Sequence, residues 1–162
     1  MTNLQDGLQR IATQISVSDL ERSTRFYCEG LGFAEGPSSG VFTAAPDSEI
    51  AKMLGLPGGC TFQNRHLLRP DGGLEMVQLH QPEPHRERMP RLTNVGAKGL
   101  LFNCRDAAAL AGRLVELGGT LIYGGKDGAT GTYPSYFVAD PDGIQIQLVS
   151  VPPEALKTAL DH

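Results

Sequence analysis

The sequence predicts an α+β protein built from two copies of a strand–helix–strand–strand–strand (βαβββ) module. Alternating apolar and polar residues mark the strands, and two capped amphipathic segments mark the helices. The order of these elements is the same in both halves of the chain. Each main helix starts at an aspartate, Asp19 or Asp106, and each leads into a Leu-Gly pair. The chain therefore has the pattern of a duplicated module.

The first strand is expected from Leu8 to Val17, because apolar and polar residues alternate there. Its inward face carries Ile11, Ile15 and Val17. Ser18, followed three positions later by Glu21, is typical of a helix start. The helix is expected to run to about Glu29, and Gly30 and Gly32 provide its stop. Its apolar stripe consists of Leu20, Phe26, Tyr27 and Leu31.

The rest of the first module, residues 8–80, contains strands and one insertion. Phe33 re-enters as a strand, and a second extended stretch is expected near Val41–Ala45. Ser48 and Gly55 bracket a short helix, Glu49–Leu54, which has no counterpart in the second half. We interpret this segment, about residues 47–56, as an insertion and a candidate lid. Strands over 61–69 and 74–80, joined by a turn at 70–73, complete the module.

Residues 81–96 are rich in proline and charge and are interpreted as a linker. The second module, residues 97–150, repeats the pattern. Strands are expected over 99–104, 120–123, 136–139 and 144–149, with a helix from Asp106 to Leu117. A glycine-rich loop covers 124–131, and residues 151–162 form a tail or a short helix. We expect the 162 residues to form a single domain.

Composition excludes several classes of function. The formal charge is −4, and no run of Lys or Arg is longer than a pair, so neither nucleic acid nor a membrane surface is an expected partner. No apolar stretch approaches the roughly 20 residues that span a bilayer. The N-terminus lacks the pattern of a leader peptide, which favours a cytoplasmic location. Cys28, Cys60 and Cys104 lack metal-type spacing and are interpreted as thiols.

Two stretches in this order resemble the vicinal oxygen chelate superfamily of glyoxalases, bleomycin resistance proteins and extradiol dioxygenases. The first stretch is Ile-Ser-Val-Ser-Asp-Leu-Glu-Arg-Ser-Thr-Arg-Phe-Tyr at 15–27, followed by Leu-Gly-Phe at 31–33. The second is Tyr-Phe-Val-Ala-Asp-Pro-Asp-Gly at 136–143, followed by Leu148. The resemblance covers about residues 8–150. It implies a glyoxalase-like, half-open mixed β-barrel around a small-molecule pocket, and it implies a homodimer.

Metal-using members of this superfamily hold one divalent ion with ligands from the first and last strands of each module. Carried over to this sequence, the ligand positions fall on Ala12, Glu75, Gly99 and Gln147. Ala12 and Gly99 offer no donor atom, and the other two are too few for Mg²⁺, Mn²⁺ or Zn²⁺. We therefore expect no metal and no other cofactor. A non-standard metal site that uses His66 or His80 stays open.

Alternation along the strands gives the residues of the pocket face. Ile144, Ile146 and Leu148 are expected to point at the helices, which leaves the intervening residues for the pocket. The same reasoning applies to the first strand of each module. The residues predicted to bind substrate are Gln14, Ser16, Asn103, Gln145 and Gln147, with His80 at the pocket mouth.

Glu75 is the one acidic residue that alternation and the family pattern jointly place on this face. It shares the face with Val77 and Leu79. A carboxylate among apolar residues in a central strand is costly unless it is paired or used. We therefore predict that Glu75 is the catalytic residue and acts as a proton shuttle.

Three functions fit these observations. The first is a metal-free enzyme of the isomerase or lyase type that acts on a small oxygenated molecule by acid–base chemistry. The second is a metal-free protein that binds a small molecule or an antibiotic. The third is a metal-dependent glyoxalase or dioxygenase. We favour the enzyme over the binding protein because the chain has no Trp and only 6% aromatic residues, whereas a drug-sequestering groove is expected to have flat aromatic walls.

Overall fold

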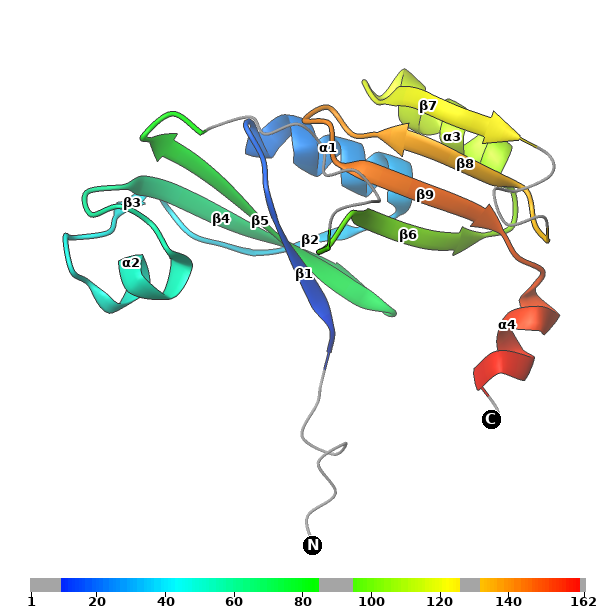
Figure 1. Ribbon diagram of the computed structural model, residues 1–162, viewed down its shortest axis with the longest axis horizontal. Coiled ribbons are helices and arrows are strands. Elements are labelled where there is room, and N and C mark those ends of the chain that lie inside the picture. Colours follow the sequence, from blue (N-terminus) through cyan, green and yellow to red (C-terminus); the bar gives the residue numbers. More distant parts are fainter. Residues whose placement is uncertain (1–9, 85–94, 126–131, 161–162) are drawn as a thin grey trace, which may run out of the picture. The chain divides into compact units, whose positions relative to one another are not determined.

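The computed structural model describes residues 10–84, 95–125 and 132–160, and the chain divides into two compact units, Met1–Arg86 and Glu87–His162 (Figure 1). The elements of the first unit are β1 (Ala12–Ser16), α1 (Leu20–Leu31), β2 (Ala34–Ser38), β3 (Phe42–Thr43), α2 (Glu49–Leu54), β4 (Thr61–Arg69) and β5 (Gly72–Gln81). Those of the second unit are β6 (Gly99–Cys104), α3 (Ala107–Glu116), β7 (Thr120–Gly125), β8 (Ser135–Ala139), β9 (Gln145–Ser150) and α4 (Pro153–Leu160).

Both units have the same sheet topology. The strand order is β1-β5-β4-β2 in the first unit and β6-β9-β8-β7 in the second. The first and last strands of each unit pair in parallel, and the other pairs are antiparallel. The α+β class and the duplicated βαβββ pattern are therefore confirmed. Each sheet is open and is not closed into a barrel, because each has two edge strands. The first unit adds β3, which pairs with β4, and α2.

Helix α1 lies along one face of the first sheet (Figure 1). The predicted stripe of Leu20, Phe26, Tyr27 and Leu31 is buried, and so are Leu67, Leu74 and Met76 from β4 and β5. This apolar layer is the core of the first unit. It fixes which face of each strand is left open, because successive side chains point to opposite sides of a strand.

Both ends of α1 correct the expectation. The N-cap is Asp19 and not Ser18, because Asp19 is the extended residue whose carboxylate accepts from the backbone N–H of Arg22. Ser18 instead accepts a hydrogen bond from the Arg22 guanidinium. Gly32 alone stops the helix, with a φ of 70° that side chains rarely adopt, whereas Gly30 is buried within the helix.

Residues 8 and 9 of the expected first strand lie outside the described residues, and Arg10 and Ile11 are not part of the strand. Described strand structure starts at Ala12, and Ile11 is 79% exposed instead of packing inward. The reason is that β1 is an edge strand, so Ile11, directly before it, has a neighbouring strand on one side only. Val17 is buried as predicted. The extended stretch expected near Val41–Ala45 is reduced to the two residues of β3.

Helix α2 has the bounds expected from the sequence, between an N-cap at Ser48 and a left-handed Gly55. It is fixed to the open face of the sheet by a small buried cluster of Ala44, Ala51 and Phe62. Partly buried residues pack around this cluster, namely Phe42, Ile50, Leu54, Leu56, Val77 and Leu79. The insertion is therefore an anchored wall at one end of the open face.

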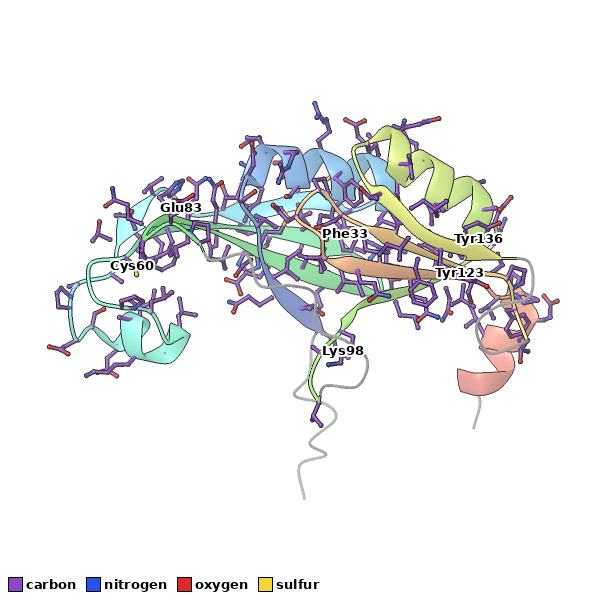
Figure 2. The ribbon with its side chains drawn as sticks, turned by 45° about the horizontal axis from the view of Figure 1, so that its top comes forward. Phe33, Cys60, Glu83, Lys98, Tyr123 and Tyr136 are labelled. Atoms are coloured by element: carbon purple, nitrogen blue, oxygen red, sulfur yellow. The ribbon has the colours of Figure 1, made fainter. Side chains whose placement is uncertain are left out.

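In the second unit, α3 starts at its N-cap Asp106, as predicted, and covers one face of the sheet with Ala107, Ala111 and Leu114. Val138, Ile146 and Leu148 are buried in the same unit. On the other face lies Tyr123 of β7 (Figure 2). Its ring centroid is 6.4 Å from that of Phe137 of β8. No helix in the described part of the chain is long and apolar enough to cross a membrane.

Candidate functional site

Three polar side chains form one row across adjacent strands on the open face of the first sheet. Gln14 on β1 lies opposite Glu75 on β5, and Glu75 lies opposite His66 on β4. Directly paired residues put their side chains on the same face, with Cβ atoms about 4.5–5.5 Å apart. The next row holds Ser16, Val77 and Asn64. Glu75 is therefore at the centre of a polar patch on the middle strand.

Glu75 is held by two side-chain amides. Gln14 Nε2 donates to Oε2 at 3.1 Å, and Asn64 Nδ2 donates to Oε1 at 2.9 Å. A carboxylate only accepts hydrogen bonds, so each amide must turn its NH₂ group toward Glu75. The two hydrogen bonds come from opposite neighbouring strands, and they fix the carboxylate in one orientation above the sheet.

The polar patch borders an apolar surface. Val77 and Leu79 follow Glu75 at alternate positions on β5, and Leu79 pairs with Phe62 on β4. Phe62 in turn lies against Phe42 of β3, with 4.1 Å between ring centroids. Because α2 packs on these residues, a ligand at Glu75 would meet a carboxylate with amides on one side and an apolar wall on the other.

The nearby arginines of β4, Arg65 and Arg69, make their contacts on the opposite face of the sheet. Arg65 donates to Thr24 and Glu21 of α1, and its side chain is 16% exposed. The hydrogen bond and the positive charge of Arg65 lower the pKa of Glu21 below its usual range. Arg69 pairs with Asp71 and lies over the Phe33 ring. Among the contacts described, neither arginine pairs with Glu75.

The other predicted site residues fall in three places. Ser16 lies on the open face, one row from Glu75, and is exposed. His80 is exposed and lies where the register between β4 and β5 shifts. In the second unit, Gln145 and Gln147 of β9 alternate with the buried Ile146 and Leu148, and Asn103 of β6 lies opposite Val149 of β9. All three therefore share the open face of that unit's sheet.

The four family positions do not form a metal-ligand set. Ala12 and Gly99 have no donor atoms, and both oxygens of Glu75 are engaged by amides. Gly99 is also sterically closed: a Cβ added there would lie 2.1 Å from the Gln145 carbonyl oxygen. Among the described residues, no group of three His, Cys, Asp or Glu side chains could hold a metal ion. The donors at these four positions do not fit a divalent ion.

Asn64 and His66 were missed by the sequence reasoning as partners of Glu75. The signal that could have found them is the turn between β4 and β5. Arg69 pairs with Gly72, so only Pro70 and Asp71 connect the strands. A two-residue turn fixes the register of a hairpin, and this register places His66 opposite Glu75.

The comparison with protein families decides the classification. Residues 7–148 match the model described as the glyoxalase/bleomycin resistance protein/dioxygenase superfamily. This chain belongs to that superfamily. Its paired βαβββ units and the position of Glu75 on a last strand agree with the resemblance seen in the sequence. No curated protein matches the chain.

Solved structures similar to this superfamily member support the fold. A glyoxalase family protein from Bacillus cereus is 20% identical with a TM-score of 0.70, and the match covers 88% of this chain and 93% of that one. A trypanothione-dependent glyoxalase I from Leishmania major is 20% identical with a TM-score of 0.61, over 95% and 94% of the two chains. The fosfomycin resistance protein FosX from Mesorhizobium loti is 18% identical with a TM-score of 0.55, over 94% and 98%.

Proposed function

We propose that this superfamily member is a small-molecule enzyme of the isomerase or lyase type, in which Glu75 accepts a proton from the substrate. The observation that carries the proposal is the Glu75 carboxylate, which is held at both oxygens by Gln14 and Asn64 on the open face of the first sheet. Proton transfer needs a base in a fixed orientation within hydrogen-bond reach of the substrate. Two hydrogen bonds from opposite sides provide that orientation.

The substrate class follows from the groups around Glu75. Each amide uses one N–H for Glu75, which leaves a second N–H and a carbonyl oxygen on both Gln14 and Asn64. Such groups bind hydroxyl and carbonyl oxygens without competing for the proton. The apolar wall at Val77 and Leu79 suits the carbon skeleton beside them. We therefore propose a small oxygenated substrate and a reaction that uses no metal.

A binding protein is the second candidate. The Phe42–Phe62 pair, with 4.1 Å between ring centroids, supplies an aromatic surface close to the apolar wall. The likeness in fold to a fosfomycin resistance protein makes an antibiotic one candidate ligand, as an analogy only. A metal-dependent glyoxalase or dioxygenase is disfavoured by the donor set. We further propose a cytoplasmic homodimer, in which a second copy covers open sheet edges.

Exchange of substrate protons with the solvent distinguishes the two proposed functions, enzyme and binding protein. The purified protein is incubated in D₂O with dihydroxyacetone, glyceraldehyde, acetoin and lactate, and loss of each carbon-bound proton is followed by ¹H NMR. If the protein is the proposed enzyme, at least one compound should incorporate deuterium only when the protein is present, and the variant Glu75→Gln should lose this activity. A compound that raises the melting temperature without any exchange would instead favour the binding protein.

A further inference from the structure

His66 is the neighbour of Glu75 whose side chain has no other assigned use. It lies directly opposite Glu75 in the antiparallel pairing of β4 with β5 and is half-buried. Within the described part of the chain, its ring has no hydrogen bond or ion pair. Gln14 and Asn64, by contrast, are both committed to Glu75. Among these neighbours of Glu75, His66 is therefore the titratable side chain that forms no described hydrogen bond or ion pair.

We propose that His66 is the second proton-transfer group of this site and acts on the substrate oxygen while Glu75 acts on the carbon. The inference rests on the proposed function. Cross-strand partners have Cβ atoms about 4.5–5.5 Å apart and project from the same face. A carboxylate and an imidazole at this separation can reach adjacent atoms of one small molecule, and imidazole both gives and takes protons near neutral pH.

The step balances for a hydroxyl-bearing carbonyl compound without any oxidant or reductant. Glu75 takes the proton from the carbon that bears the hydroxyl, and the electron pair of that C–H bond forms the C=C bond of an enediol. The protonated His66 ring gives its N–H proton to the carbonyl oxygen. In the second half, Glu75 returns its proton to the former carbonyl carbon, and His66 recovers a proton from the hydroxyl of the other carbon.

The surroundings of His66 support a role at the ligand. Asn64, two residues earlier on the same strand, binds Glu75, and its backbone N–H donates to Ser39 Oγ. This part of β4 is therefore hydrogen-bonded to Glu75 of β5 on one side and to Ser39, which directly follows β2, on the other. Gly36 of β2 packs so close to β4 that an added Cβ would lie 3.2 Å from the His66 carbonyl oxygen. The strand that presents His66 is thus firmly placed.

The experiment compares exchange with conversion for dihydroxyacetone and glyceraldehyde, which are isomers of each other. His66→Gln should lower conversion by about 10²-fold, the usual scale for a general acid, and should lower deuterium incorporation by much less, because glutamine can still hydrogen-bond the carbonyl oxygen but cannot pass a proton between the two oxygens. Glu75→Gln should lose both reactions. His162→Gln, at the last position of the sequence, is the control for replacing a histidine by glutamine. It should change neither deuterium incorporation nor conversion.

Three results would overturn the assignment. Conversion by His66→Gln within about threefold of wild type would show that His66 moves no proton. Equal loss of exchange and conversion, with an unchanged melting temperature, would show that His66 only positions Glu75 or the ligand. Absence of exchange by the wild-type protein on every compound would overturn the proposed function itself, and this result is distinct from the other two because it needs no variant.

Discussion

Gln14 and Glu75 are direct neighbours on the parallel strands β1 and β5, and the amide of Gln14 donates to the carboxylate at 3.1 Å. Asn64 completes the arrangement from β4 at 2.9 Å. These residues come from the first, third and last main strands of one βαβββ unit. The arrangement around Glu75 therefore exists only when that sheet is formed, which makes the site a property of the fold.

The two amides should differ in their effect on stability. Asn64 is half-buried, so Asn64→Leu removes a hydrogen bond that water replaces poorly, and we expect a loss of about 1–3 kcal/mol in the free energy of unfolding. Gln14 is exposed, and Gln14→Leu should cost under about 1 kcal/mol. Both variants should slow turnover about tenfold or more, because the base loses its orientation. Urea unfolding and steady-state kinetics measure the two effects, and an unchanged turnover in both variants would contradict a positioning role.

Two glycine substitutions test the closed position on β6. A Cβ at Gly99 would meet the Gln145 carbonyl oxygen at 2.1 Å, so Gly99→Ala must shift the backbone and should cost about 1–3 kcal/mol. Gly112, in the middle of α3, has nothing within 4 Å of an added Cβ. Gly112→Ala should therefore stabilise the protein by roughly 0.5–1 kcal/mol. Thermal unfolding of the two variants compares them, and a Gly99→Ala protein as stable as Gly112→Ala would show that a ligand side chain could stand at position 99.

Removal of divalent ions should have little effect. The family positions supply too few donors, so protein purified without chelator should carry well below about one ion per chain. EDTA should then shift the melting temperature by no more than about 1–2 °C, since we expect no bound ion for it to withdraw. Elemental analysis checks the content. Stoichiometric Zn²⁺, Ni²⁺, Mn²⁺ or Fe²⁺ would show that the ligand set has been misassigned.

The Glu21–Arg65 pair predicts a pH-dependent contribution to stability. Its N–O distance is 2.6 Å, and Arg65 lowers the pKa of Glu21 in the folded state. A lowered folded pKa means that the contribution is present above the unfolded value, about 4.3, and is lost as pH falls through the folded value. Glu21→Gln should therefore cost up to about 1 kcal/mol at pH 7, because Glu21 is exposed, and less at pH 2. Glu49→Gln, which removes the carboxylate of an exposed pair with Lys52, is the control. An equal loss of stability at both pH values in Glu21→Gln would contradict the linkage.

Much of the fold could be predicted from the sequence because its signals are local. Asp106 and Ser48 cap their helices, Gly32 and Gly55 have left-handed backbone conformations, and the strand Thr61–Arg69 has the expected bounds. The first helix cap was assigned one residue early, because Ser18 and Asp19 are both good caps and only the local geometry separates them. The alternation predicts that Ile11 packs inward, but Ile11 is exposed because it directly precedes an edge strand and has a neighbouring strand on one side only.

The site was harder to predict than the fold because it depends on cross-strand register. Glu75 and Gln14 could be placed on one face by alternation within their own strands. Asn64 requires the pairing of β4 with β5, which follows from the two-residue turn at Pro70 and Asp71. The position of α2 against Val77 and Leu79 depends on long-range packing, which no local pattern in residues 47–56 specifies.

The most direct test of the central claim is the effect of Glu75→Gln on turnover and on ligand affinity, measured on a compound that the wild-type protein exchanges. Glutamine keeps the size of the side chain but cannot accept the proton, so turnover should fall by roughly 10²-fold or more while affinity changes little. Glu83→Gln makes the same change of charge at an exposed residue beyond the end of β5 and should leave both at wild-type levels (Figure 2). Wild-type turnover and wild-type affinity in Glu75→Gln would show that the carboxylate is structural and would contradict the account of this site.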